Sequence, residues 1–109
     1  MSTPENKVKA KVRAVLKTYG VYHFMPATYG YGVSGTPDII CCTHGRFMGI
    51  EVKAGKNNPT NLQLKALNDI AAHGGVAVIV NETGIDALSM LLDGIKESPA
   101  KLYDLRYDE

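Results

Sequence analysis

The fold is decided by residues 37–53, which read PDIICCTHGRFMGIEVK. Two runs rich in apolar residues flank the dipeptide His44-Gly45. Glycine there supplies the positive φ that a two-residue hairpin turn needs. We therefore expect two antiparallel strands, over residues 37–43 and 46–54, joined by a tight turn.

In the register set by this turn, Asp38 lies directly across from Glu51, with their Cβ atoms roughly 4.5–5.5 Å apart. Lys53 is two residues beyond Glu51 and shares its face of the sheet. Two carboxylates so placed repel each other, and a divalent cation between them removes the penalty. Mg²⁺ suits such a pair, and Mn²⁺ is expected to substitute for it. Because two adjacent carboxylates oppose a depressed lysine pKa, we expect Lys53 to act by charge and positioning and not as a general base.

The rest of the chain predicts an α/β fold, with a mixed β-sheet flanked by helices in the order α-β-β-β-α-β-α. Helix caps are expected at Thr3, Thr60 and Thr83. The continuous apolar run at residues 76–80 predicts a central strand, and the preceding βαβ crossover predicts a parallel pair. Residues 101–109 are left open as a short strand, an arm or a loose end. The expected elements are helices at residues 4–19 and 60–73 and after Thr83 as far as Ser98-Pro99, and strands at residues 21–25, 37–43, 46–54 and 76–80.

Length and composition indicate a single domain, residues 1–109, of ordinary globular character. The chain has 109 residues, 45% hydrophobic and 21% charged, with a formal net charge of +1. A role in binding nucleic acid must therefore depend on local charge. No stretch has the length of a transmembrane helix, and no signal peptide is expected. The adjacent Cys41 and Cys42 cannot form a disulfide framework, which favours a reduced, cytoplasmic compartment, and they point to opposite faces of a strand, which disfavours a shared zinc ion.

The quoted stretch resembles the signature of the PD-(D/E)XK nucleases. The resemblance comprises Gly35-Thr36-Pro37-Asp38-Ile39-Ile40, then thirteen residues from Asp38 to Glu51-Val52-Lys53. Residues 49–53, the later Thr60-x-x-Gln63 and the run 74–79 look more narrowly like the VRR-NUC group. The similarity spans about Glu5 to Leu92. It implies a restriction-endonuclease-like core and, for stand-alone members, a homodimer that acts on branched DNA in the manner of Holliday junction resolvases. A small nuclease of this kind would suit a phage or mobile element.

The resemblance also implies roles for individual residues. Asp38 and Glu51 would hold the metal with the backbone carbonyl of Val52, and Lys53 would be the catalytic lysine. Glu5 matches a glutamate of the first helix that often joins the metal site, although an acid in a first turn also favours the helix dipole. Gln63 matches a glutamine near the site, although it also completes a capping box with Thr60.

Candidate DNA contacts come from three parts of the sequence. The first is a loop of alternating tyrosine and glycine, whose rings would suit base stacking or contact with the sugar-phosphate backbone, or would merely pack locally. The second is a basic row on the first helix, which is either solvated surface or a phosphate contact. The third is a lysine just after the second strand of the hairpin, which is a candidate phosphate contact. The candidates are Tyr29, Tyr31, Ser34, Lys9, Arg13 and Lys56.

Three functional hypotheses follow from the sequence. The first is a Mg²⁺-dependent endodeoxyribonuclease that hydrolyses phosphodiester bonds in branched DNA as a homodimer, with the last helix and the tyrosine-bearing tail as guesses for the dimer surface. The second is a non-catalytic DNA-binding or assembly module that keeps the nuclease fold. The third is a structural α/β domain in which the facing carboxylates are coincidental. Intact Asp38, Glu51 and Lys53 favour the first.

Overall fold

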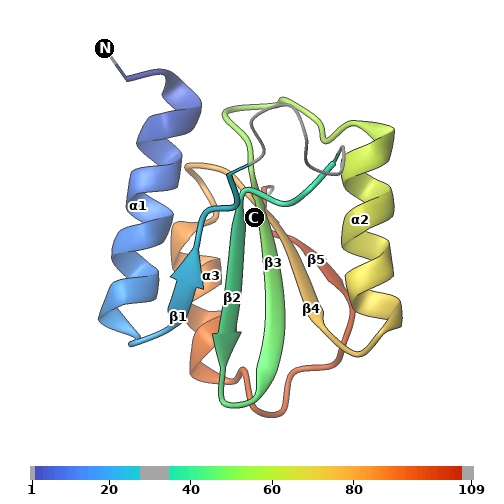
Figure 1. The fold of residues 1–109 in the computed structure, drawn as a ribbon. Helices are drawn as coiled ribbons and strands as arrows, with labels where there is room; N and C mark the ends of the chain where they lie inside the picture. Colours follow the sequence, from blue (N-terminus) through green and yellow to red (C-terminus); the bar gives the residue numbers. More distant parts are fainter. Residues whose placement is uncertain (1, 28–34, 107–109) are drawn as a thin grey trace.

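The computed structural model of the chain describes residues 2–27 and 35–106. These residues form an α/β fold with three helices and a five-stranded mixed sheet. The sheet order is β1-β2-β3-β4-β5, with β1, β2 and β3 antiparallel and β3, β4 and β5 parallel (Figure 1). The elements are α1 (Pro4–Thr18), β1 (Tyr22–Phe24), β2 (Ile39–Thr43), β3 (Arg46–Val52), α2 (Asn61–Ala72), β4 (Val76–Val80), α3 (Ile85–Asp93) and β5 (Leu102–Asp104).

The hairpin has the predicted turn and register. His44 and Gly45 have φ values of 52° and 75°, the left-handed conformation that a two-residue turn requires at both positions. Thr43 pairs with Arg46, and the ladder continues to Ile39 opposite Ile50. The next step outward brings Asp38 to the level of Glu51, as the sequence predicted.

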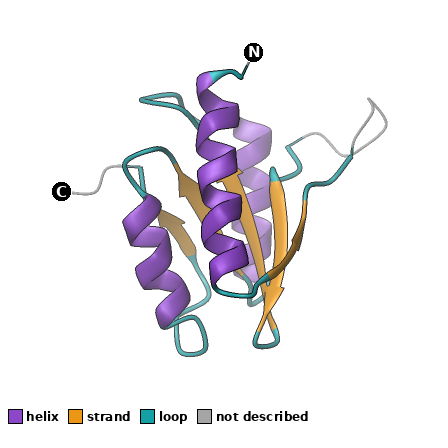
Figure 2. Ribbon diagram, turned by 90° about the vertical axis from the view of Figure 1, so that its left-hand side faces the viewer, coloured by secondary structure: helices purple, strands orange, loops and turns teal. Residues whose placement is uncertain are grey.

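Two layers of helix enclose the sheet. The larger core lies between one face of the sheet and helices α1 and α3, which bury Val8, Val12, Leu16, Leu88 and Leu92 there. The smaller core lies on the other face, where Leu67 of α2 packs with Ala77 and Ile79 of β4. Figures 1 and 2 show α1 and α3 on one side of the sheet and α2 on the other. Within residues 2–27 and 35–106, no helix is long and apolar enough to cross a membrane.

The caps of α1 and α2 are confirmed, and the cap of α3 is not. Thr3 accepts a hydrogen bond from the backbone N–H of Asn6, and Thr60 forms the full capping box at α2. The expected cap at Thr83 is wrong, because Gly84 precedes α3 and makes no side-chain cap. The hydroxyl of Thr83 instead lies 2.7 Å from the side-chain oxygen of Asn81, which ties down the turn after β4. Helix α3 also ends at Asp93, before the predicted Ser98-Pro99 stop.

The chain after α3 adds a fifth strand, so the predicted element order is incomplete. Strand β5 runs parallel to β4, and the backbone N–H of Leu105 donates to the carbonyl of Ile79 at 2.8 Å. Arg106 follows β5. Its guanidinium pairs with Asp104 at 2.8 Å and donates to the carbonyl of Asn57 at 2.9 Å. Strand β5 has only three residues, and a pattern of that length does not distinguish a strand from a loose tail in the sequence.

Gly35 controls how the chain enters β2, and its replacement by alanine is expected to destabilise the fold. Its φ is +86°, and an added Cβ would collide with the backbone carbonyl of Leu62 at the start of α2. We expect Gly35→Ala to lower the free energy of unfolding by about 2–4 kcal/mol in urea titrations. Gly20→Ala is the matched control, because Gly20 also has a positive φ but its Cβ would meet nothing within 4 Å. Equal losses in the two variants would contradict the steric argument.

Candidate active site

Asp38 and Glu51 come together at the edge of the sheet where β3 and β4 end. Asp38 immediately precedes β2, and its Oδ2 accepts a hydrogen bond of 2.8 Å from the backbone N–H of Val52. Glu51 lies in β3 and is 1% exposed. Because its neighbours Ile50 and Val52 belong to the core under α1 and α3, Glu51 points to the opposite face, the one on which α2 packs. The hairpin therefore joins two carboxylates, one partly exposed and one buried.

Lys53 completes this group. Its Nζ lies 3.5 Å from Oε2 of Glu51, and its side chain is 12% exposed. Its backbone N–H donates to the carbonyl of Val80 at 2.9 Å, which extends the parallel β3–β4 ladder by one residue. Because the sheet holds its backbone, the lysine charge stays beside the buried carboxylate.

Glu51 is in an unfavourable environment for a charged carboxylate. Burial raises its pKa from the usual 4.5 to about 8, and the charge of Asp38 adds to the rise, while the charge of Lys53 acts in the opposite direction. Within the described part of the chain, its Oε1 is buried and has no hydrogen-bond partner. A buried carboxylate oxygen without a partner is costly, and a bound cation would satisfy it.

The raised pKa of Glu51 makes the metal-free fold sensitive to pH. Since the folded state holds this proton more tightly than the unfolded chain, the stability that it contributes is complete below pH 4.5 and is lost as the pH rises to about 8. We expect the melting temperature in EDTA to fall across this window. The check is a series of thermal melts from pH 4 to 9, with Glu51→Gln as the comparison. A parallel fall in the variant would show that another group is responsible.

The residues present fit a magnesium ion. Mg²⁺ is usually held by one or two carboxylates together with water and substrate phosphate oxygens, and Asp38 with Glu51 supplies that number. The unpartnered Oε1 of Glu51, noted above, is the atom that a cation would satisfy. Glu5 is half-buried in the first turn of α1, and residues 2–27 and 35–106 contain no group of three or more His, Cys, Asp or Glu side chains arranged to hold a metal. Glu5 is therefore not brought into one ligand group with the pair, while metal contact by the Val52 carbonyl stays a prediction.

Of the two roles open to Gln63, the structure shows the capping one. Its Oε1 accepts from the backbone N–H of Thr60 at 2.8 Å, and the hydroxyl of Thr60 accepts from the backbone N–H of Gln63 at 3.2 Å. The start of α2 is also close to Gly35, which leads into Asp38. Gln63 therefore holds the helix end beside the entry to β2, and a catalytic role for it stays a prediction.

The candidate DNA contacts are distributed unevenly. Lys9 reaches the candidate active site, with its Nζ 3.7 Å from Oδ1 of Asp38, a contact that the helical pattern did not predict. Arg13 lies one turn further along α1 and is half-buried. Lys56 is exposed in the turn after β3. The remaining candidates, Tyr29, Tyr31 and Ser34, lie outside the described residues.

Sequence reasoning missed the residues that hold the loop after Lys53. The buried Asn81 donates from its side-chain amide to the carbonyl of Gly55 at 2.8 Å, and the backbone N–H of Gly55 donates to Glu82 at 2.7 Å. Arg106 holds the next residues, since it also donates to the side chain of Asn58 at 2.9 Å. Asn81 and Glu82 do directly follow the predicted strand at residues 76–80, which is the one signal that the sequence offered.

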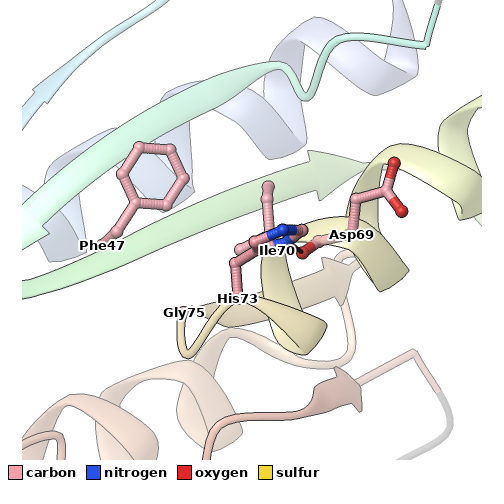
Figure 3. Close-up of a pocket in the computed structure, with 5 residues that line it drawn as sticks. All are labelled: Phe47, Asp69, Ile70, His73 and Gly75. Atoms are coloured by element: carbon pink, nitrogen blue, oxygen red, sulfur yellow. Dashed lines mark hydrogen bonds between the residues drawn. The ribbon is translucent and has the colours of Figure 1, made fainter.

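A second feature of the α2 face is an apolar cavity of about 310 Å³ at the other end of β3 (Figure 3). It is lined by Phe47, Ile70 and Gly75, with Asp69 and His73 beside them. Asp69 is already paired with Lys65 at 2.9 Å. The cavity therefore offers apolar surface and no second carboxylate pair, and the group around Glu51 remains the candidate active site.

The comparisons with known proteins add no relative. A scan against known protein families finds no match for this chain, and a search of curated proteins finds no similar sequence.

Proposed function

We propose that this chain is a metal-dependent endodeoxyribonuclease with a restriction-endonuclease-like core of the PD-(D/E)XK type. The observation that carries the proposal is the buried Glu51, whose Oε1 has no partner among the described residues, beside Asp38 and Lys53. A merely structural sheet would gain stability by replacing such a carboxylate with an apolar residue. The cost is understandable if the group binds a cation and a phosphodiester.

Each residue has a distinct task in this proposal. Mg²⁺ would supply a water of lowered pKa and would neutralise charge on the phosphoryl oxygens. Asp38 and Glu51 would hold the ion. The hydrogen bond from Val52 N–H occupies Oδ2 of Asp38, so Oδ1 is the oxygen that would bind the ion. Lys53, whose backbone is held by the β3–β4 ladder, would stabilise the negative charge that develops on the phosphoryl group.

The proposed partner is branched DNA, cut by a homodimer inside the cell. A second copy would supply a second site for the second strand. Helix α2 makes its main contacts with β3, β4 and β5 (Figure 1). The part of the same sheet face that α2 does not cover is the surface that we favour for the dimer. Tyr22, Phe24 and Phe47 are exposed there. At roughly 100 Å² each, they would supply over a third of the ~800 Å² per partner of a standard interface.

The direct test is a cleavage assay on labelled four-way junction, flap and linear duplex DNA, with Mg²⁺, Mn²⁺ or EDTA, on protein whose molar mass is measured by light scattering. Cutting of a branched substrate that requires metal would support the proposal. Junction binding without cutting under any condition would favour the non-catalytic DNA-binding module. Neither cutting nor binding, with no rise in melting temperature on adding Mn²⁺, would leave only a structural domain.

A further inference from the structure

A small cavity lies on α1 beside the catalytic carboxylates. Its volume is about 200 Å³, and it is lined by Asn6, Lys9, Ala10 and Arg13 of the helix and by Met25, which follows β1. The lining brings two cations, a side-chain amide and an apolar floor into one place. Asp38 approaches this cavity through its contact with Lys9, but among the residues that the structure describes no acidic side chain lines the cavity itself. The composition suits a group with negative charge.

Arg13 is the first sign that the cavity is a binding site. Its Nε is buried and has no hydrogen-bond partner among the residues that the structure describes. A guanidinium N–H without an acceptor is costly, and arginine is especially suited to phosphate because its planar donors match phosphate oxygens in pairs. An ordinary surface arginine would direct this donor into water.

Lys9 is the second sign that the cavity is a binding site, because it lines the cavity and also contacts Asp38. Its Nζ is 3.7 Å from Oδ1 of Asp38, and both side chains remain partly exposed, at 23% and 21%. The contact is long for an ion pair, so it constrains the lysine only weakly. Since Oδ2 of Asp38 is held by Val52 N–H, Oδ1 is the oxygen left for a cation, and Lys9 now competes for it.

We propose that this cavity is a phosphate subsite, which takes a DNA backbone phosphate next to the one that is cut. In the free protein Lys9 neutralises Asp38; when metal binds Asp38, Lys9 turns into the cavity and holds the flanking phosphate together with Arg13. Lys9 is therefore a positioning residue that couples metal binding to DNA binding. This inference depends on the proposed nuclease function, and it names the part of α1 along which the DNA backbone passes.

The test uses two variants and one matched control. Lys9→Met and Arg13→Gln each remove one subsite cation, and Lys17→Met removes the next cation of the same helical row, which does not line the cavity. Binding of labelled flap DNA is followed by fluorescence anisotropy in Mn²⁺ over a series of KCl concentrations, with every variant made in a Lys53→Met background so that the metal is bound and cutting is suppressed. Mn²⁺ affinity without DNA is measured by titration calorimetry, and thermal melts confirm that each variant is folded.

We expect Lys9→Met and Arg13→Gln each to weaken DNA binding about tenfold and to reduce the slope of log affinity against log salt by about 1. Lys17→Met should change affinity less than about twofold. Lys9→Met should also bind Mn²⁺ several-fold more tightly than the wild type, because the competing cation is gone, and Arg13→Gln should not. Arg13→Lys should recover part of the DNA affinity.

Two results would overturn the inference. One is equal loss of DNA affinity in Lys9→Met, Arg13→Gln and Lys17→Met, which would mean diffuse attraction to the helix and no subsite. The other is unchanged Mn²⁺ affinity in Lys9→Met, which would remove the coupling. Either result can occur while the wild type still cuts DNA, so failure of the subsite is distinguishable from failure of the proposed nuclease function, which a wild type that neither cuts nor binds Mn²⁺ would show.

Discussion

We expect the replacement of Glu51 by glutamine to abolish the proposed metal binding and DNA cutting and to stabilise the metal-free fold at alkaline pH. Glutamine keeps the shape of the side chain and removes the charge that burial and Asp38 oppose, the same causes that raise the pKa of Glu51 to about 8. At pH 8.5 most molecules of the wild type carry a negative charge on the buried Glu51, whereas the glutamine of the variant is neutral. We expect a loss of cutting of ~10³-fold or more. We also expect a rise in melting temperature of several degrees, since about 1 kcal/mol shifts it by roughly 4–8 °C in a domain of this size.

The measurement combines calorimetric titration of Mn²⁺, single-turnover cleavage and thermal melts in EDTA at pH 8.5. Asp69→Asn is the control, because Asp69 is exposed and paired only with Lys65 on the surface of α2. It should leave all three quantities unchanged. If Glu51→Gln kept Mn²⁺ binding or lowered the melting temperature, Glu51 would be a structural residue and not a metal ligand.

We expect the replacement of Lys53 by methionine to remove the proposed nuclease activity and to keep the proposed metal binding. Nζ of Lys53 lies 3.5 Å from Oε2 of Glu51, and under the proposed function its charge would stabilise the phosphoryl group. We expect the single-turnover rate at saturating Mn²⁺ to fall about 10²–10³-fold, the cost of removing one preorganised donor. Titration calorimetry should still detect Mn²⁺ binding to the variant. Loss of both would mean that Lys53 holds the carboxylates in place and has no separate catalytic role.

Lys53→Arg distinguishes the two possible roles of this lysine. Arginine keeps the positive charge but does not lose its proton in proteins, so it can stabilise charge and cannot act as a general base. Partial recovery of the rate would support the electrostatic role. A rate as low as that of Lys53→Met would instead indicate proton abstraction by the lysine.

The hairpin and its two carboxylates were predictable because their causes are local. The positive φ at His44-Gly45 fixes the turn, the turn fixes the register, and the two-residue period of a strand fixes which side chains share a face. The N-cap of α1, the capping box of α2 and the apolar run of β4 were predictable for the same reason. Thr83 does not cap α3, and its hydroxyl instead donates to the backbone carbonyl of Arg106, which is distant in the sequence.

The sequence by itself determined that a hairpin sets Asp38, Glu51 and Lys53 side by side, between helices whose apolar stripes require a sheet to pack on. The packing of distant elements was needed to show that Lys9 of α1 reaches Asp38 and that Arg13 lines a cavity beside it. It also showed that β5 pairs with β4 and that Arg106 holds the loop after β3. The physical reason is the range of the interactions. Turn conformation, capping and strand period act over a few residues, whereas ion pairs between elements and the burial of Glu51 depend on how whole helices pack against the sheet.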